Sequence, residues 1–151
     1  SSEEEVREWT MDVLESLGFE FISYLENTGV HLISMSSRGR HSLRRPLPLD
    51  GKGITVKVAN EGRSILIRDL TENADYVEGP IPALSELAVP ITLGEDVIAV
   101  INVESQNLDA FNEHDQRVIE TLAMHVSSAT KKLRSEFSEE IDPGKSVPLT
   151  Q

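Results

Sequence analysis

Two apolar runs in the second half of the chain, Ser85–Ile91 and Val97–Ser105, constrain its fold more than any other feature. The segment between them contains Gly94, Glu95 and Asp96, which supply the turn chemistry that strands avoid, so the runs predict a β-hairpin. Side chains alternate between the two faces of a strand, and both faces are apolar in the first half of the second run. We therefore expect the second run to be a central strand that is covered on both sides.

The composition of the 151-residue chain restricts its size class and its partners. Its length and its 38% hydrophobic content predict one ordinary domain with polar ends. A formal net charge of −12 disfavours nucleic-acid binding, because the overall field would repel a polyanion. The absence of cysteine excludes disulfides, thiolate zinc sites, thiol redox chemistry and thioether-linked cofactors. Nothing resembles a signal peptide or a membrane span, so we expect a soluble, cytoplasmic protein.

Both ends of the chain have the pattern of amphipathic helices. Ser2 and Glu5 form a capping-box pair that predicts a helix ending at Gly18, and Asn112 with Asp115 predicts a second helix start. The apolar stripes are Val6, Trp9, Val13, Leu14 and Leu17 in the first helix and Ile119, Leu122, Val126, Ala129 and Leu133 in the second. The second stripe has heptad spacing, so the helices either pack together on a sheet or also present a stripe to a second copy, which predicts a homodimer.

The region between these helices is predicted to contain mainly strands. The expected elements are a hairpin of strands 19–26 and 30–36, a strand at 41–47, a helix at 54–61, a strand at 65–67 and a loop at 70–84. Pro46 and Pro48 limit the third strand to an edge, since proline donates no ladder hydrogen bond. A loop as long as 70–84 is uncommon in a compact domain unless it has a function.

The order of these elements, together with a series of short motifs, resembles the GAF domain family. The matching motifs are the Gly53-Ile54 helix that ends at Gly62, Asp69 after a strand, Tyr76 in the long loop, the strands Ser85–Ile91 and Val97–Ser105, and Phe111 with Asp115 at a helix start. Each motif is weak alone, and their order and spacing over roughly residues 20–134 carry the resemblance. One departure is Ala99, where many family members have glycine.

The resemblance implies an α+β fold related to profilin and PAS domains, with a central antiparallel sheet. The N- and C-terminal helices would pack on one face, and the short helix and the long loop would cover a ligand pocket on the other. The corresponding divisions are residues 1–18 for the N-terminal helix, 19–134 for the GAF domain, whose C-terminal helix starts at 112, and 135–151 for a helix extension, linker or tail.

In function, the resemblance implies a small-molecule sensor that regulates a linked output domain, as in a sensor histidine kinase, and that is not itself an enzyme. It identifies no cofactor: covalent bilin or haem attachment would need a cysteine, and the cyclic-nucleotide signature is missing. One alternative is a cysteine-less relative of the free methionine sulfoxide reductases, whose acidic positions match Glu86 and Glu104. Another is a ligand-free dimerisation module, which Ala99 between the bulky Ile98 and Val100 would favour.

The hairpin carries the sharpest candidate ligand-binding residues, Glu86, Asn102 and Glu104. A loop of odd length centred on Glu95 would place Glu86 opposite Glu104 and Ala88 opposite Asn102, and directly opposed residues share a face. Two carboxylates so placed would raise the pKa of one of them or attract a cation, an ammonium group or hydrogen-bond donors. Alternatively, both lie in solvent at the strand ends, and a loop of even length would put them on different faces.

Three further candidates complete the predicted ligand site. Asp69 and Tyr76 bracket the long loop, and Ser85 begins the matching strand. Asp69 has the alternative role of a turn or cap residue, and Tyr76 that of an anchor for the loop.

The remaining motifs predict no chemistry of their own. A basic cluster would either bind a phosphate or an acidic partner or protect a sheet edge by charge; it consists of Arg38, Arg40, His41, Arg44 and Arg45. The four histidines do not fall at metal-ligand spacing, and no nucleophile motif or phosphate-binding glycine loop is present. We therefore expect neither a metal site nor a catalytic constellation.

Overall fold

The computed structural model describes residues 2–39, 45–73 and 82–141. Its helices are α1 (Glu3–Ser16), α2 (Ile54–Glu61) and α3 (Glu113–Ile141), with a 3-10 turn η1 at Leu70–Glu72. Its strands are β1 (Phe21–Asn27), β2 (His31–Arg38), β3 (Leu47–Pro48), β4 (Ile65–Ile67), β5 (Ser85–Leu93) and β6 (Asp96–Ser105).

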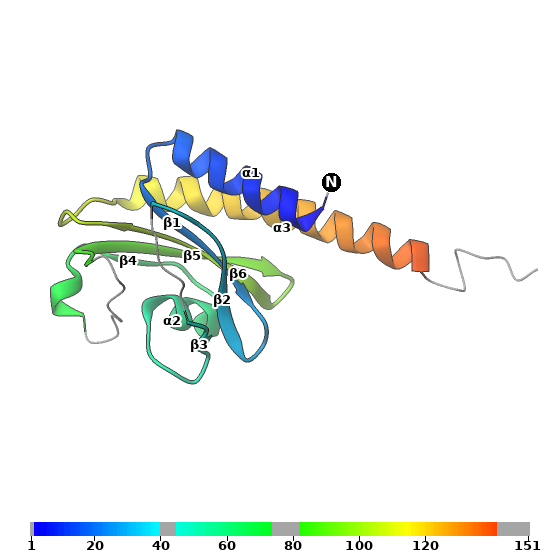
Figure 1. The fold of residues 1–151 in the computed structure, drawn as a ribbon, viewed down its shortest axis with the longest axis horizontal. Coiled ribbons are helices and arrows are strands. Elements are labelled where there is room, and N and C mark those ends of the chain that lie inside the picture. The colour runs from blue at the N-terminus through cyan, green and yellow to red at the C-terminus, as the bar shows by residue number, and fades with distance from the viewer. Residues whose placement is uncertain (1, 40–44, 74–81, 142–151) are drawn as a thin grey trace, which may run out of the picture.

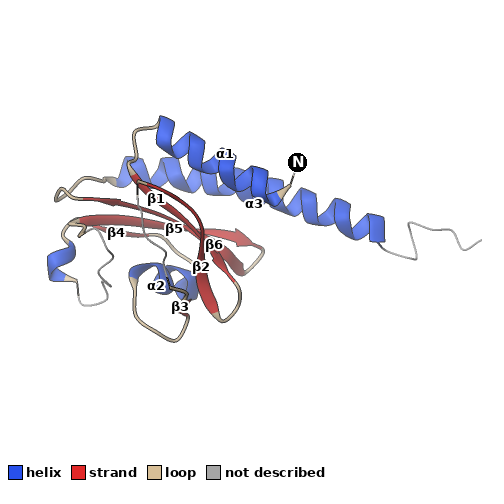
Figure 2. Ribbon diagram, viewed as in Figure 1, coloured by secondary structure: helices blue, strands red, loops and turns tan. Residues whose placement is uncertain are grey.

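The strands form one antiparallel sheet in the order β3-β2-β1-β6-β5-β4. In Figure 1, α1 and α3 lie side by side on one face of this sheet, and α2 lies on the opposite face. Figure 2 shows the same layers by type, with the strands between the two groups of helices. The predicted α+β fold is confirmed, and β6 is a central strand as the apolar pattern indicated.

Both long helices begin at the predicted caps. The Ser2 hydroxyl accepts a hydrogen bond from the Glu5 amide at 3.1 Å, and the Glu5 carboxylate accepts one from the Ser2 amide at 2.8 Å. Asn112 and Asp115 make the same reciprocal pair at 2.9 Å in each direction. These bonds satisfy amide groups that have no partner inside the helix, so both starts follow from the local sequence.

The core faces of these helices differ in part from the predicted stripes. The buried side chains are Thr10, Met11 and Leu14 in α1 and Ile119, Leu122, Ala123, Val126 and Thr130 in α3. Trp9 and Leu17, which belong to the predicted α1 stripe, are 50% and 53% exposed. Because α1 packs on both α3 and the sheet, its buried face is centred on Leu14 rather than on the stripe that contains Trp9.

The third strand is shorter than the pattern indicated. The prediction was a strand at 41–47, but β3 consists of Leu47 and Pro48 alone, and residues 41–44 lie outside the described ranges. β3 pairs with β2 through Leu47 opposite Leu32 and Pro48 opposite His31. This edge position agrees with the restriction that proline imposes on a strand.

The turn of the β5–β6 hairpin differs from the odd-length loop that was predicted. Leu93 pairs with Asp96, so only two residues form the turn, and Gly94 takes the positive φ of +60° that such turns favour. The register then shifts, because Thr92 pairs with Val97 whereas Ile91 pairs with Ala99, which leaves Ile98 as the extra residue of a β-bulge. The bulge moves every later pair by one residue.

Two apolar clusters occupy the two faces of the sheet. Under α1 and α3 the sheet contributes Ile22, Tyr24, Leu87, Val89, Ile91, Ala99, Ile101 and Val103. On the other face α2 packs on Leu25, Ala88 and Val100. The strands therefore alternate as predicted, and the second face also carries the polar residues described next.

Candidate functional site

The predicted acidic pair lies on the sheet face that also carries α2. Glu86 is directly opposite Glu104, and Ala88 is directly opposite Asn102, as predicted. The reason is the bulge at Ile98, which compensates for the even-length turn. Glu86, Asn102 and Glu104 are only 4%, 2% and 6% exposed, so the alternative of solvent-exposed strand ends is wrong.

A serine of β1 extends this group across the sheet. Ser23 is directly opposite Asn102 in the β1–β6 pairing and is also buried. We call Ser23, Glu86, Asn102 and Glu104 the polar floor. Protein interiors bury few polar and charged side chains, so four of them on one face make this part of the sheet the candidate site.

Within the polar floor, the side chain of Asn102 has a buried acceptor that lacks a hydrogen-bond donor among the described residues. Its side-chain oxygen Oδ1 is buried and accepts no hydrogen bond within the described residues. A buried acceptor without a donor costs about 1–3 kcal/mol, so such groups are rare in stable domains. A ligand that donates a hydrogen bond to Oδ1 would remove this cost.

Serines of β2 continue the polar surface beyond β1. The Ser23 and Ser37 hydroxyls lie 3.5 Å apart, and those of Ser37 and Ser34 lie 3.0 Å apart. Sequence reasoning missed all three serines. Period-two alternation could have placed Ser23 on the face opposite Ile22 and Tyr24, but only the β1–β6 pairing brings it to Asn102.

α2 closes the apolar end of the same face. Gly62 ends the helix in the left-handed conformation, at φ +73°, and its amide donates to the Val58 carbonyl. Ala88 and Val100, which α2 covers, are completely buried. Ala99 and Ile98, by contrast, belong to the cluster under α1 and α3, so these two residues do not fill the pocket side.

Two further predicted site residues, Asp69 and Ser85, make hydrogen bonds outside the polar floor. Asp69 caps η1, since its carboxylate accepts from the Thr71 amide at 3.0 Å and from the Thr71 hydroxyl. Ser85 shares the face of Leu87, under α3, where its hydroxyl donates to the Asn107 carbonyl at 2.7 Å. Tyr76 lies outside the described residues. Asp69 and Ser85 therefore have structural partners, and Ser85 lies on the other face of the sheet from Asn102.

Arg38 is the described member of the basic cluster that has a defined partner. Its guanidinium lies 3.1 Å from Glu8, 3.0 Å from Asp12 and 3.6 Å from Glu15, all on α1. The pKa of Glu8 is lowered by a hydrogen bond from Ser36 and, to a lesser extent, by Arg38. Arg38 thus links β2 to α1 through ion pairs. Arg40, His41 and Arg44 lie outside the described residues.

A second polar group lies between the helices and the sheet. Tyr24, Arg7, Thr130 and Arg134 line a small cavity of about 20 Å³, together with Glu3 and Glu26. Arg134 binds Glu3 through two hydrogen bonds of 3.1 Å, and Nε of Arg7 is buried without a partner among the described residues. Burial raises the pKa of Tyr24 to about 12. The cavity is large enough for one water molecule.

Two further properties limit the chemistry of the described residues. No group of three or more His, Cys, Asp or Glu side chains within residues 2–39, 45–73 and 82–141 is arranged to hold a metal ion. No described helix is both long enough and apolar enough to cross a membrane.

The family assignment follows from a match over most of the chain. The profile of the GAF domain family matches residues 1–131, so the chain belongs to this family. The sequence matches no curated protein.

Solved structures with the same fold include both free methionine-R-sulfoxide reductases and the GAF domain of another protein. The free methionine-R-sulfoxide reductase from Neisseria meningitidis, in complex with its substrate, is similar with a TM-score of 0.77 and 18% identity, over 85% of this chain and 77% of that chain. The type II enzyme from Thermoplasma acidophilum gives 0.74 and 18%, over 83% and 92%. The GAF domain of a phosphoenolpyruvate-protein phosphotransferase from Coxiella burnetii gives 0.76 and 17%, over 90% and 86%.

These structures contradict the expectation that the chain is not an enzyme. Free methionine-R-sulfoxide reductases are enzymes, and the chain shares their fold. Membership in the GAF family therefore does not separate a sensor from an enzyme, and the fold of this chain is one on which catalysis occurs.

Proposed function

We propose that this GAF domain binds a small molecule on the polar floor, between the sheet and the elements on the α2 side, and regulates a linked output domain. The observation that carries the proposal is the buried, unsatisfied Oδ1 of Asn102 among other buried polar groups. A domain that needed only a stable core would gain by replacing this group with an apolar one. A ligand that donates a hydrogen bond to Oδ1 would explain why the chain retains Asn102 at this buried position.

The chemistry of the polar floor favours a particular class of ligand. Carboxylates and an amide oxygen accept hydrogen bonds, and opposed carboxylates attract positive charge. The floor offers Glu86, Glu104 and the Asn102 oxygen, in a chain whose net charge is −12. We therefore propose a ligand that presents a protonated amine or several N–H or O–H groups, such as a free amino acid, rather than an anion.

The same residues support a second candidate, recognition of free methionine sulfoxide or a closely related amino acid. The free methionine-R-sulfoxide reductase from Neisseria meningitidis has this fold, and its structure was solved in complex with its substrate. The present sequence contains no cysteine, so a reductase that uses its own thiolate cannot operate on these residues. A turnover assay with an added thiol reductant separates binding alone from catalysis.

We propose that the terminal helices transmit the effect of ligand binding to an output domain and to a second copy of the chain. β1 and β6 carry Ser23 and Asn102 on the floor face, and Tyr24 and Ile101 on the face beneath α1 and α3. A change in these strands on binding would reach both helices directly. We propose that the helices pass this change to an output domain, such as a histidine kinase, and to a second copy of the chain.

A thermal-shift and calorimetric screen tests the proposed ligand class. The panel contains free L-methionine sulfoxide, other amino acids, cyclic nucleotides and citrate as an anionic control. We expect at least one amine to raise the melting temperature, and Glu86→Gln to weaken its binding tenfold or more. Glu95→Gln, an exposed neutralisation in the turn of the same hairpin, is the matched control and leaves binding unchanged. Equal binding by the two variants contradicts a role for the polar floor.

A further inference from the structure

Serine hydroxyls lead from the polar floor to the surface of β2. Ser23 is directly opposite both Asn102 of β6 and Ser37 of β2, so these three residues lie side by side across the sheet. The hydroxyls of Ser37 and Ser34 lie 3.0 Å apart. Ser23 is 1% exposed, whereas Ser34 is half-buried and Ser37 is exposed. We call these three serines the hydroxyl row, and solvent reaches it at the β2 end.

A β-bulge in β2 places Ser34 in the hydroxyl row. The β1–β2 register shifts at Met35, which is an extra residue of β2. Ser34 and Ser37 are three residues apart and would point to opposite faces of a regular strand. Because of the bulge, Ser34 is opposite Leu25 and Ser37 is opposite Ser23, and both of these partners face the floor side. Bulges next to active sites redirect side chains in this way.

The polar groups along the row have hydrogen-bonding capacity left for a ligand. The hydroxyl oxygens of Ser23 and Ser37 lie 3.5 Å apart, compared with about 2.7–2.8 Å in an ordinary O–H···O hydrogen bond. Beside Ser23, Oδ1 of Asn102 is buried and has no donor among the described residues. Hydroxyls both donate and accept, so a ligand lying across β6, β1 and β2 would supply a donor to Asn102 and bind the serines as well.

The position of the row sets the length and the polarity of such a ligand. Neighbouring strands lie about 4.8 Å apart, so Ser37, two strands from Asn102, lies about 10 Å from it. Glu86 and Glu104 are on β5 and β6, at the other end. The guanidinium of Arg38, the residue after Ser37, pairs with acids of α1 on the opposite face. The row itself is uncharged, and it therefore suits an uncharged polar group far from the carboxylates.

We propose that the ligand of the polar floor is an elongated amine whose far end carries an uncharged hydrogen-bonding group, such as a hydroxyl or an amide, which the hydroxyl row binds. This inference rests on the proposed function and deepens it. Glu86 and Glu104 bind the ammonium group, and the row selects ligands by their length and by their polar end. Ser37 is then a residue that determines specificity.

Three simple amines test this selection on the full chain: 6-aminohexan-1-ol, hexylamine and 2-aminoethanol. The first is long and has a polar end, the second is of similar length without the hydroxyl, and the third is too short to reach the row. Titrations followed by ¹H–¹⁵N NMR measure dissociation constants into the millimolar range. A hydrogen bond changes a dissociation constant by about two- to ten-fold, so we expect 6-aminohexan-1-ol to bind about three-fold or more tightly than either of the others.

Two neighbouring serines of β2 provide matched variants. Ser37→Ala removes the exposed hydroxyl of the row. Ser36→Ala is the control, since Ser36 is opposite Tyr24 on the helix side and donates to Glu8 of α1 at 2.6 Å. We expect Ser37→Ala to bind 6-aminohexan-1-ol and hexylamine equally, and Ser36→Ala to keep the preference of the wild type. An equal preference in the two variants, or no preference in the wild type, overturns the inference.

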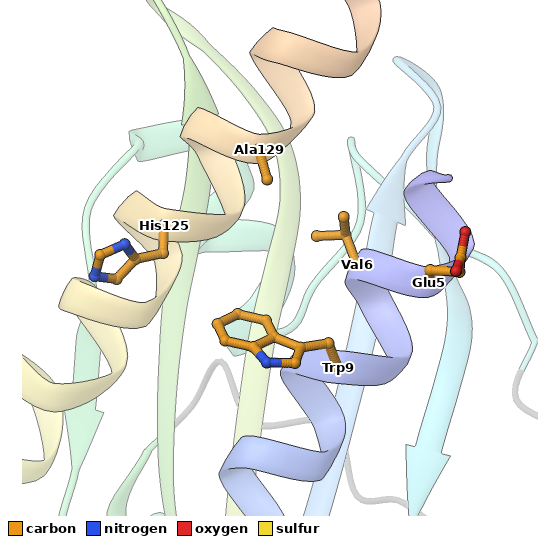
Figure 3. A pocket seen from close by; sticks show the side chains of 5 residues that line it. All are labelled: Glu5, Val6, Trp9, His125 and Ala129. Carbon is orange, nitrogen blue, oxygen red and sulfur yellow. The ribbon is translucent and has the colours of Figure 1, made fainter. Parts of the chain in front are cut away.

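A competing site for a long amine lies on the other side of the sheet. α1 and α3 form a groove of about 650 Å³ that is lined by Glu5, Val6, Trp9, His125 and Ala129. Figure 3 shows the indole of Trp9 projecting from α1 toward α3, with His125 on the facing helix. Trp9 is the only tryptophan of the chain, so its emission reports on this groove. We expect unchanged emission at saturating 6-aminohexan-1-ol. A change that follows the titration places the amine in the groove and contradicts the inference.

Failure of this inference is distinguishable from failure of the proposed function. Equal binding of 6-aminohexan-1-ol and hexylamine by the wild type, with weaker binding of both by Glu86→Gln, overturns the hydroxyl row and supports the amine site. Binding of none of the three amines at millimolar concentrations contradicts the amine class of the proposed function, and this inference with it.

Discussion

The two faces of the central sheet are built from the same strands but have opposite chemistry. On the side of α1 and α3, Ile101 and its neighbours on β6 are apolar and belong to one continuous core. On the other side, Asn102 and Glu104 alternate with them and are equally buried. Neighbouring residues of one strand therefore differ in role. The apolar residues stabilise the core, and we infer that the buried polar residues are kept for ligand binding.

Burial alone does not distinguish these faces, since both are close to completely covered. The partners of particular buried polar atoms differ between the two sides, and Nε of Arg7, beside the small cavity, is the helix-side atom that lacks a partner among the described residues. On the helix side Ser85 and Thr10 donate to the carbonyls of Asn107 and Val6 at 2.7 Å each. On the floor side the Asn102 oxygen has none among the described residues. Substitutions on the two faces should therefore change the free energy of unfolding in opposite directions.

The largest effect is expected on the helix side. Ile101→Ala removes a completely buried side chain and leaves a cavity, so the free energy of unfolding should fall by about 2–5 kcal/mol. Urea denaturation followed by circular dichroism measures the change. Val30→Ala, at a residue that is 64% exposed, is the control and should change stability by less than about 0.5 kcal/mol. A loss below about 1 kcal/mol for Ile101→Ala would show that the core relaxes around the site.

A second effect belongs to the polar cavity on the same side. Burial raises the pKa of Tyr24 to about 12, from about 10 in the unfolded chain. The unfolded chain therefore loses the phenolic proton first, and stability that is fully present below pH 10 is lost as the pH rises through 12, by about 2–3 kcal/mol. Tyr24→Phe should remove this part of the alkaline loss. Parallel declines of wild type and variant between pH 9 and 12 would contradict a shifted Tyr24.

On the floor side the expected change in stability is small and has the opposite sign. Asn102→Leu replaces an unsatisfied buried acceptor by an apolar group of similar size, so the protein should be unchanged or more stable by about 1 kcal/mol. Ligand binding should be lost in the same variant. Asn60→Leu is the control: Asn60 donates to the Leu49 carbonyl at 2.8 Å, and losing this bond should cost about 1 kcal/mol. Destabilisation of Asn102→Leu by more than Asn60→Leu would mean that Oδ1 is satisfied in solution.

Much of the fold could be predicted because it depends on local signals. The capping pairs Ser2–Glu5 and Asn112–Asp115, and the helix 54–61 that ends at Gly62, are all present as predicted. The two apolar runs on either side of Gly94 also form the predicted hairpin. These elements need only backbone geometry and short-range hydrogen bonds, which the sequence displays directly.

The errors arise where pairing between distant segments decides the outcome. The bulge at Ile98 could not be foreseen, because an extra residue is visible only in the register of the partner strand. Ser23 joins the polar floor only through the β1–β6 pairing. The position of Ser85, in contrast, could have been predicted, since alternation gives it the face of Leu87 and not that of Glu86.

The smallest expected effect concerns the charged border of the helix side, where α1 meets β2. The pKa of Glu8 is lowered by the Ser36 hydrogen bond and by Arg38, so its contribution to stability is present above the unfolded pKa, near 4.5, and is lost as the pH falls through the folded value. Half of the Glu8 side chain is exposed, so the contribution should be about 0.5 kcal/mol or less. The difference in melting temperature between wild type and Glu8→Gln should therefore be small at pH 7 and vanish near pH 3. A melting-temperature difference between wild type and Glu8→Gln that grows as the pH falls would show that the Glu8 carboxylate does not stabilise the contact between α1 and β2. That contact would then depend on packing alone.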